Sequence, residues 1–287
     1  MTIHRDLICS SHTISGVMPG GPVPARHGFE ERVAACAAAG YTGMCLHFRD
    51  YRALKEAGHK DEDLREVLQR HGMRHVSLEF LVDWFLDGTD SEQARADEAT
   101  LHAAARAYGA DSFNIGSDFQ GRGIPRAVMK ERLAGLCRRA GNAGLKVALE
   151  IVPWSDVPDV ETALDMIDGI DNAGLVVDSW HIFRGGVPLS EVERIPGDRI
   201  FCVQVNDAEE TVHGALSEDT TRRKPCGEGV FDLDAFLDSL NRAGADVPVS
   251  VEIISPQFAA LDVESAARGS IAGARRLVER HAARTSS

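Results

Sequence analysis

KVALEIVPW, residues 146–154, is one of four short apolar segments that each carry a polar side chain near the end. The other three are GLVVDSWH (174–181), FCVQVNDA (201–208) and VSVEIIS (249–255). Each segment is near-continuously apolar and partly β-branched, which is typical of strands buried on both faces of a parallel sheet. The four segments therefore predict parallel strands that end in polar residues.

Similar runs earlier in the chain complete a set of candidate strands: 6–10, 43–47, 75–80, 112–116, 146–152, 174–178, 200–205 and 249–254. The helices expected between them are 29–39, 61–70, 91–108, 126–143, 160–168 and 233–243. This alternation predicts a (β/α)8 TIM barrel, an α/β fold. The alternative, a doubly wound open sheet, usually has a G-x-G-x-x-G loop after its first strand, which residues 10–24 (SSHTISGVMPGGPVP) lack. No linker divides the chain, so we expect one domain over residues 1–287.

The composition and net charge are typical of a globular protein and make some partners unlikely. The 287 residues are 44% hydrophobic and 26% charged, close to the globular average. A formal net charge of −13 repels phosphate backbones and anionic headgroups, so we expect neither nucleic acid nor a membrane as a partner. The cysteines form no C-x-x-C pair and the chain start lacks a signal pattern, which predicts a reduced, cytoplasmic protein. A small-molecule substrate is the expected partner, and a homo-oligomer or a small partner subunit stays open.

The polar residues at the strand ends predict a metal site, because catalytic groups of parallel barrels sit at the carboxyl ends of the strands. Buried carboxylates on adjacent strands are costly to desolvate and repel one another, and a divalent cation removes both costs. One acid alone is more often a helix cap or an ion-pair partner, but four polar residues in strand order favour a metal. An all-oxygen set suits Mg²⁺ or Mn²⁺, with Co²⁺ or Zn²⁺ as further candidates. The expected ligands are Glu150, Asp178, Gln204 and Glu252.

In these segments the chain resembles the xylose isomerase-like TIM-barrel superfamily of sugar phosphate isomerases and epimerases. The resemblance extends to SSHT (10–13), VSLEFLVDW (76–84), VVDSWHIFRGG (176–186) and CGEGVFDL (226–233). It implies that Glu150, Asp178, Gln204 and Glu252 bind one divalent metal. Many members have His where this chain has Gln204, and dehydroshikimate dehydratases of the family resemble the Gln variant. Members also often carry P-G-E-G where residues 226–229 read CGEG.

Further candidates lie near the same strand ends. His181, three residues after Asp178, is expected to bind substrate or shuttle a proton, the alternative being a core histidine. Arg223 is expected to hold a substrate carboxylate or hydroxyl, although a solvated charge run accounts for it equally well. His47 and Glu79 end the second and third candidate strands and are expected to line the pocket, with an ion pair as the alternative for Glu79.

The chemistry that the resemblance implies is proton abstraction next to a carbonyl, with a metal-stabilised enediolate. Glu150 and Glu252 are the expected base and acid. Returning the proton to carbon gives epimerisation or isomerisation of a keto-sugar or a derivative, which is the expected function. The alternative is a lyase that expels a β-substituent, as a dehydratase of dehydroshikimate or an inosose, or as a C-glycoside deglycosidase subunit.

Two other classes compete with this interpretation. Abasic-site endonucleases of the same family resemble histidine-rich, multi-zinc enzymes with a basic DNA face, and a chain with 11 histidines and a net charge of −13 does not fit them. A non-catalytic sugar-binding barrel would not need a metal flanked by carboxylates. We therefore expect an enzyme.

Overall fold

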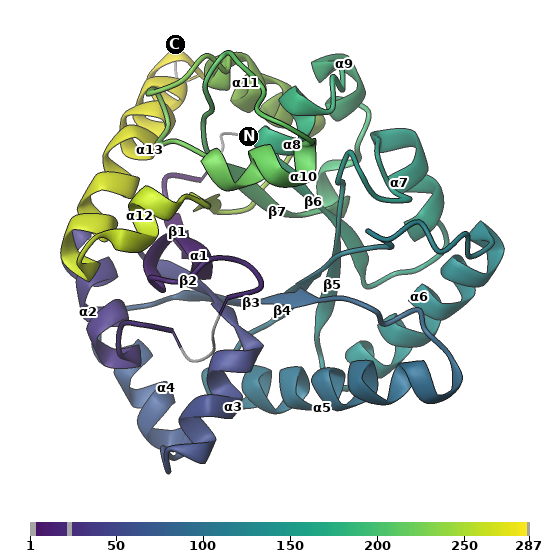
Figure 1. The fold of residues 1–287 in the computed structure, drawn as a ribbon. Coiled ribbons are helices and arrows are strands. Elements are labelled where there is room, and N and C mark those ends of the chain that lie inside the picture. The colour runs from purple at the N-terminus through teal and green to yellow at the C-terminus, as the bar shows by residue number, and fades with distance from the viewer. Residues whose placement is uncertain (1–3, 22–24, 286–287) are drawn as a thin grey trace.

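The computed structural model describes residues 4–21 and 25–285, and its eight parallel strands close into a barrel in chain order. The strands occupy the centre of the molecule and the helices surround them (Figure 1). The strands are β1 (Leu7–Ser10), β2 (Gly43–His47), β3 (His75–Leu81), β4 (Ser112–Ile115), β5 (Lys146–Glu150), β6 (Ala173–Asp178), β7 (Ile200–Val205) and β8 (Val249–Val251). The predicted (β/α)8 barrel is confirmed.

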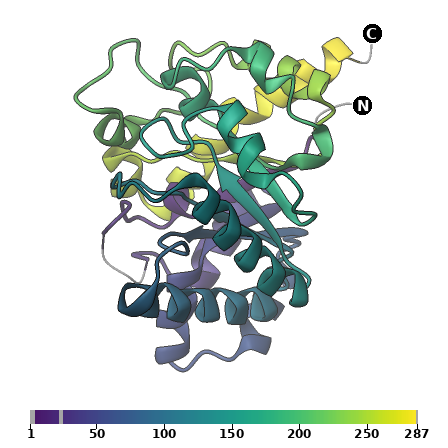
Figure 2. The same ribbon diagram turned by 90° about the vertical axis from the view of Figure 1, so that its right-hand side faces the viewer.

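The outer layer is helical, and in the side view the strands are visible between the helices (Figure 2). Its helices are α2 (Phe29–Ala39), α3 (Phe48–Glu56), α4 (Asp61–Arg70), α5 (Ser91–Tyr108), α6 (Arg126–Asn142), α7 (Val160–Ile167), α11 (Leu233–Ala243) and α13 (Val263–Thr285). Shorter helices lie in the loops: α1 (Ser11–Ile14), α8 (Ser179–Arg184), α9 (Leu189–Val192), α10 (Leu216–Asp219) and α12 (Pro256–Ala260).

Helices α2, α4, α5 and α11 begin and end where the sequence predicts. The residues after α2 and α5 are Gly40 and Gly109, with φ of 98° and 75°. Only glycine adopts this left-handed conformation at little cost, so a glycine after an amphipathic run is a reliable end signal. Helices α6 and α7 end one residue earlier than predicted.

Strands β1 and β4 are one residue shorter than predicted, and β5 and β8 end two and three residues early, because the chain leaves the sheet at Glu150 and before Glu252. Strand β5 ends at Glu150 and β8 ends at Val251, whereas continuation to residues 152 and 254 was expected. Beyond β8, the backbone N–H of Ile253 donates to Oγ1 of Thr13, 2.8 Å away, instead of to a strand. Glu252 therefore lies just after its strand, where the loop begins.

Helix α13 was not predicted from the sequence, and it closes the outer layer by packing against α2 (Figure 1). Its buried side is built mainly from alanine, glycine and serine, with few large apolar residues. Small residues on the buried side allow close packing of helices, but they produce only a weak helical periodicity of hydrophobic residues in the sequence. This weak pattern is why the sequence did not predict α13.

The barrel interior and the layer between strands and helices form one hydrophobic core. All six cysteines are free thiols, five of them buried, as expected of a reduced protein. Among the described residues, none of the helices has both the length and the apolarity needed to cross a membrane.

Candidate functional site

Strand register brings the four predicted polar residues to one end of the barrel. Asp178 on β6 pairs with Gln204 on β7. Glu150 on β5 pairs with Val176, and residues two apart on a strand point to the same side, so Glu150 and Asp178 share a face. Glu252 directly follows β8, the other neighbour of β7. These side chains come from adjacent strands at their carboxyl ends.

A cavity of about 400 Å³ lies at this end of the barrel. Its charged, amide and imidazole side chains are His12, Glu79, Asn114, Glu150, His181, Gln204, Arg223 and Glu252. A larger hollow of about 530 Å³ lies at the amino ends of the strands, and of the side chains just named only Asn114 also lines it. Because barrel active sites lie at the carboxyl ends of strands, the smaller cavity is the candidate site.

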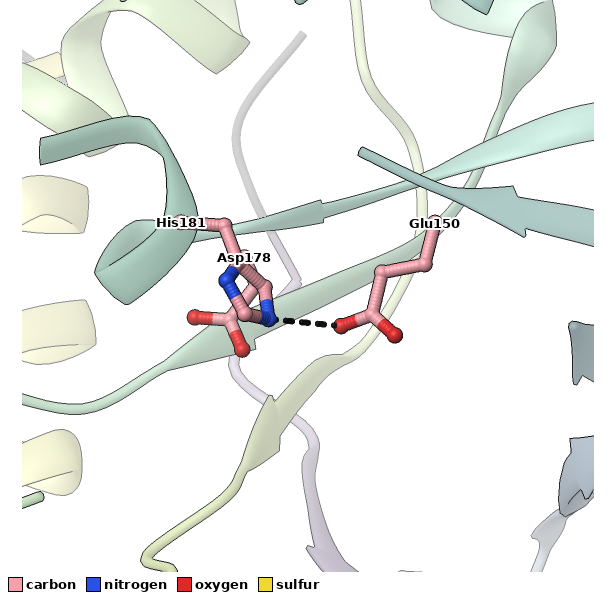
Figure 3. Close-up of side chains that lie close together, drawn as sticks. All are labelled: Glu150, Asp178 and His181. Carbon is pink, nitrogen blue, oxygen red and sulfur yellow. Dashed lines mark ion pairs between the residues drawn. The ribbon is translucent and has the colours of Figure 1, made fainter. Parts of the chain in front are cut away.

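Asp178 links β6 to the short helix α8. Its Oδ1 accepts hydrogen bonds from the backbone N–H of Trp180 at 2.7 Å and from Nδ2 of Asn206 at 2.9 Å. An Asp at this position is a favoured N-cap, so the helix begins directly at the strand end. His181 follows within α8, and its Nε2 lies 3.2 Å from Oε1 of Glu150 (Figure 3).

Glu150, Asp178 and His181 form a buried cluster in which one ligand atom from each lies within 4.8 Å of the others. Carboxylates and imidazole are the usual protein ligands of borderline divalent ions. Beside them, Oε1 of Gln204 is buried and has no hydrogen-bond partner. An unsatisfied buried acceptor costs about 1–3 kcal/mol, which a bound cation would offset. The donor set therefore fits a divalent metal ion.

Arg223 is a buried cation, 3% exposed, in the middle of this site. Its Nη1 lies 2.7 Å from Oδ2 of Asp178 and 2.6 Å from Oε2 of Glu252. Its Nη2 donates to Oγ1 of Thr220 at 3.0 Å and lies 3.3 Å from Nε2 of His181. The burial excludes a solvated charge run for Arg223.

Opposing electrostatic effects act on the carboxyl group of Glu252. Burial raises the pKa of its carboxyl group to about 7, Arg223 opposes that change, and the carboxylates of Asp178 and Glu150 add to it. Neutral pH therefore lies close to the pKa of Glu252, which is the range a general acid or base needs.

Glu79 lies in β3 rather than at its end, because the strand continues to Leu81. The pairing of β3 with β4 shifts in register between Leu78 and Leu81, and both Glu79 and Phe80 line the cavity. Adjacent residues of a regular strand would point to opposite faces, so the irregularity accounts for this arrangement. Burial, reinforced by the charge of Glu252, raises the pKa of Glu79 to about 8.

His47 is not brought into the main cavity. It lines a separate pocket of about 90 Å³ with His12 and Arg49, and its Nδ1 accepts the backbone N–H of Arg49 at 3.2 Å. Burial lowers its pKa to about 3, so His47 is neutral at physiological pH. In this position His47 serves as the N-cap of α3.

Two aromatic cavity residues, Phe80 and Phe119, were not predicted from the sequence, whereas Trp154 is a possible pocket wall by sequence, with packing as the alternative. The rings of Phe80 and Phe119 stack with centroids 6.2 Å apart, and the ring centroid of Phe119 lies 6.4 Å from that of Trp154, so the three rings form an aromatic wall. Phe80 lies in β3 and the other two lie in separate loops, so no sequence spacing marks them as a group. Ser10 lies at the end of β1, within SSHT, and its contacts with Glu79 and Glu252 depend on closure of the barrel, which the sequence does not reveal.

Asp207 anchors the segment that carries Arg223. Its backbone N–H and C=O exchange hydrogen bonds with Lys224 at 2.9 and 2.8 Å. Its carboxylate accepts the backbone N–H groups of Gly227 at 2.9 Å and Phe231 at 3.0 Å. The CGEG turn is therefore held to the end of β7, which fixes the place from which Arg223 enters the site.

Fold and cavity together define a (β/α)8 barrel with a buried cluster of metal-ligating residue types at the carboxyl ends of its strands. The chain belongs to the xylose isomerase-like TIM barrel family, whose model matches residues 33–278. The family that the sequence resembles is thus confirmed.

The chain is similar in sequence to two named enzymes and in structure to a zinc-bound protein. An inosose isomerase of Bacillus velezensis is 29% identical over 240 residues, covering 80% of this chain and 84% of that protein. A 3-dehydroshikimate dehydratase of Pseudomonas aeruginosa is 29% identical over 245 residues, and the match spans only 37% of that protein's length. A crystal structure of the IOLI protein with a bound zinc atom superposes with a TM-score of 0.85 at 23% identity, covering 96% of this chain and 99% of that chain.

Proposed function

We infer that this protein is a divalent-metal-dependent isomerase or epimerase of a small, uncharged, cyclic keto-polyol, a compound of the inosose type. The main observation behind the proposal is that two buried carboxyl groups, Glu150 and Glu252, line one cavity and that Glu150 belongs to a cluster of metal-ligating residue types with Asp178 and His181. The similarity to inosose isomerases supports the class of substrate.

Four residues would hold the metal: Glu150, Asp178, Gln204 and Glu252. The unpaired Oε1 of Gln204 and the mutual repulsion of the carboxylates favour a cation there. A divalent ion would polarise the substrate carbonyl and stabilise negative charge that develops on its oxygen. Mn²⁺ and Mg²⁺ match an oxygen-only set, and Co²⁺ or Zn²⁺ become suitable if His181 contributes.

The chain's own residues would move the proton. Glu150 and Glu252 both line the cavity, so one takes a proton from the carbon next to the carbonyl and the other returns one. His181 lies 3.2 Å from Glu150 and is suited to hold or relay a proton at a substrate hydroxyl. Arg223 holds the carboxylates of Asp178 and Glu252 in position through Nη1.

The cavity favours an uncharged substrate. Arg223 is the only Lys or Arg among the described residues that line it, and its guanidinium already pairs with Asp178 and Glu252. A substrate carboxylate or phosphate would therefore find no unpaired Lys or Arg side chain in the cavity. The aromatic wall of Phe80, Phe119 and Trp154 offers an apolar surface to the C–H face of a carbocycle.

A dehydratase is the second candidate, and Gln204 favours it. The dehydroshikimate dehydratases of the family resemble this Gln variant, and the relative from Pseudomonas aeruginosa carries that activity in its name. Dehydroshikimate bears a carboxylate, which the charge of the cavity opposes.

The test is a substrate panel for the Mn²⁺-loaded protein, containing inososes, ketohexoses and dehydroshikimate. We expect an isomeric product from an inosose, without growth of ultraviolet absorbance. Glu150→Gln and Glu252→Gln should each lower kcat by about 10²–10⁴-fold. An unsaturated product from dehydroshikimate, with no turnover of the other compounds, would establish the dehydratase instead.

A further inference from the structure

Ser10 lies between two buried carboxyl groups at the carboxyl end of the barrel. Its Oγ is 2.9 Å from Oε1 of Glu252 and 3.2 and 3.3 Å from the two carboxyl oxygens of Glu79. All three side chains are buried, with exposed fractions of 0% for Ser10, 2% for Glu79 and 6% for Glu252. Within the described structure, the Ser10 hydroxyl bridges Glu79 to the proposed acid or base of the reaction.

The number of hydrogens decides how this bridge is made. A serine hydroxyl has one hydrogen to donate and two lone pairs to accept with. If Glu79 and Glu252 were both ionised, the single hydroxyl hydrogen of Ser10 could bond only one of them. The other carboxylate oxygen would then face a lone pair of Ser10 Oγ with no hydrogen between the two oxygen atoms. Both contacts become hydrogen bonds when one carboxyl group is protonated and donates to Ser10, while Ser10 donates to the other.

The surroundings indicate which carboxyl group carries the hydrogen. Glu252 has a cation beside it, because its Oε2 lies 2.6 Å from Nη1 of Arg223. Glu79 has no ion pair among the described residues, and its Oε1 instead accepts the backbone N–H of Ser11 at 3.0 Å. Burial without a cation favours the neutral acid. The direction is therefore from Glu79 to Ser10 and from Ser10 to Glu252.

We propose that Glu79, as a neutral acid, and Ser10 form a directed hydrogen-bond chain that positions the carboxylate of Glu252 toward the substrate. The chain fixes Oε1 of Glu252, and Oε2, which lies 2.6 Å from Nη1 of Arg223, is the oxygen that remains for the metal or the substrate. Glu79 and Ser10 are positioning residues, and they act only through Glu252. The role in turnover rests on the proposed function, but the hydrogen-bond chain itself does not.

Three substitutions separate positioning from other roles. Ser10→Ala removes the bridge, and Glu79→Leu removes its donor. Glu79→Gln keeps the chain, since the amide oxygen accepts from Ser11 and the amide NH₂ donates to Ser10. The matched control is Ser117→Ala, because Ser117 is equally buried and its hydroxyl has no partner.

We expect Ser10→Ala and Glu79→Leu to lower kcat by about 10–100-fold with little change in KM, because a small misplacement of a catalytic group costs this much. Glu79→Gln and Ser117→Ala should stay within about threefold of the unmodified protein. Unchanged kcat in Ser10→Ala would overturn the proposal. Equal losses in Glu79→Gln and Glu79→Leu would also overturn it, since Glu79 would then be needed as a proton carrier or a charge.

A second measurement is independent of turnover and of the folding of Glu79→Leu. The infrared spectrum at neutral pH should contain the carbonyl stretch of a protonated carboxyl group, which Glu79→Gln removes and Ser10→Ala shifts. Absence of that band would overturn the chain even if the enzyme is active. A lack of turnover with every substrate, with the band present, would contradict the proposed function and leave the chain supported.

Discussion

Arg223 contacts two of the residues that are proposed to bind the metal. In the described structure its guanidinium neutralises Asp178 and Glu252, two of the four proposed ligands. The guanidinium and a divalent ion thus compete for the same carboxylates. Cζ of Arg223 lies 5.7 Å from the centroid of the Trp180 ring, a contact that stabilises the guanidinium. This contact does not involve the carboxylates, so we expect Arg223 to stay in the site when a metal binds them.

The first prediction concerns Arg223→Met. Removing one partner of a buried ion pair leaves uncompensated charge, so the metal-free variant should lose about 3–5 kcal/mol of stability. Mn²⁺ should restore more stability to the variant than it adds to the unmodified protein, because the competing cation is gone. Thermal denaturation with and without Mn²⁺ measures both effects. Equal stabilisation of the two proteins by Mn²⁺ would mean that Asp178 and Glu252 do not bind it.

The second prediction tests whether Gln204 or His181 is the neutral ligand that binds the metal together with the carboxylates. Gln204→Leu removes a neutral oxygen donor and should weaken Mn²⁺ binding on the order of 100-fold, whereas Gln204→His keeps a neutral ligand and should retain most of the affinity. His181→Leu serves as the matched substitution in the same cluster. Calorimetric titration with Mn²⁺ measures all three, and a larger loss in His181→Leu than in Gln204→Leu would exchange their roles.

At the scale of the element, the strand ends were predictable and the contacts between loops were not. The apolar runs define the strands, and Glu150, Asp178 and Gln204 lie at or near their ends because the runs stop there. Arg223 lies in a loop, and its burial depends on the anchoring of that loop by Asp207. Such a long-range contact leaves no periodic pattern in the sequence.

The different positions of His47 and Glu79 could not be predicted from the sequence either. Both residues end or nearly end a predicted strand, and they are register partners in the pairing of β2 with β3. The shift in β3 aims Glu79 into the cavity, whereas His47 is used to cap α3. A register shift within a strand and a side-chain helix cap are local features, and the pattern of apolar residues in the sequence does not reveal them.

The third prediction tests the packing of α13 on the CGEG turn. A Cβ at Gly273 would lie 1.9 Å from the carbonyl oxygen of Cys226, so Gly273→Ala requires the helix or the turn to move. We expect a loss of about 1–3 kcal/mol in stability, and a lower kcat because the turn leads to Arg223. In Gly135→Ala, the control in α6, the added Cβ meets only flexible arginine side chains at 3.4 Å or more. It should be neutral or stabilise by up to about 1 kcal/mol. Denaturant unfolding measures both, and similar stabilities would contradict the packing argument.

At the scale of the whole molecule, buried acids make the stability depend on pH. The pKa of Glu79 is about 8 in the folded protein against an ordinary value of 4.5, so between these values the folded state holds a proton that the unfolded state lacks. Its contribution to stability is complete below about pH 4.5 and is lost as the pH rises toward 8.

The fourth prediction follows from that sign. For the metal-free protein, the free energy of unfolding should fall by about 2 kcal/mol between pH 6 and pH 8 relative to Glu79→Gln, whose amide does not titrate. Urea unfolding at a series of pH values measures the difference. Parallel pH profiles for the two proteins would show that Glu79 has an ordinary pKa.

In the proposed reaction, this barrel takes a proton from the carbon next to a carbonyl and returns it to carbon. The most direct measurement is nuclear magnetic resonance of an inosose incubated in D₂O with the Mn²⁺-loaded protein. We expect an isomeric product with deuterium on the carbon next to the carbonyl, and no such exchange with Glu150→Gln or Glu252→Gln. Recovery of the inosose without deuterium, or an unsaturated product in place of an isomer, would rule out the proposed isomerisation.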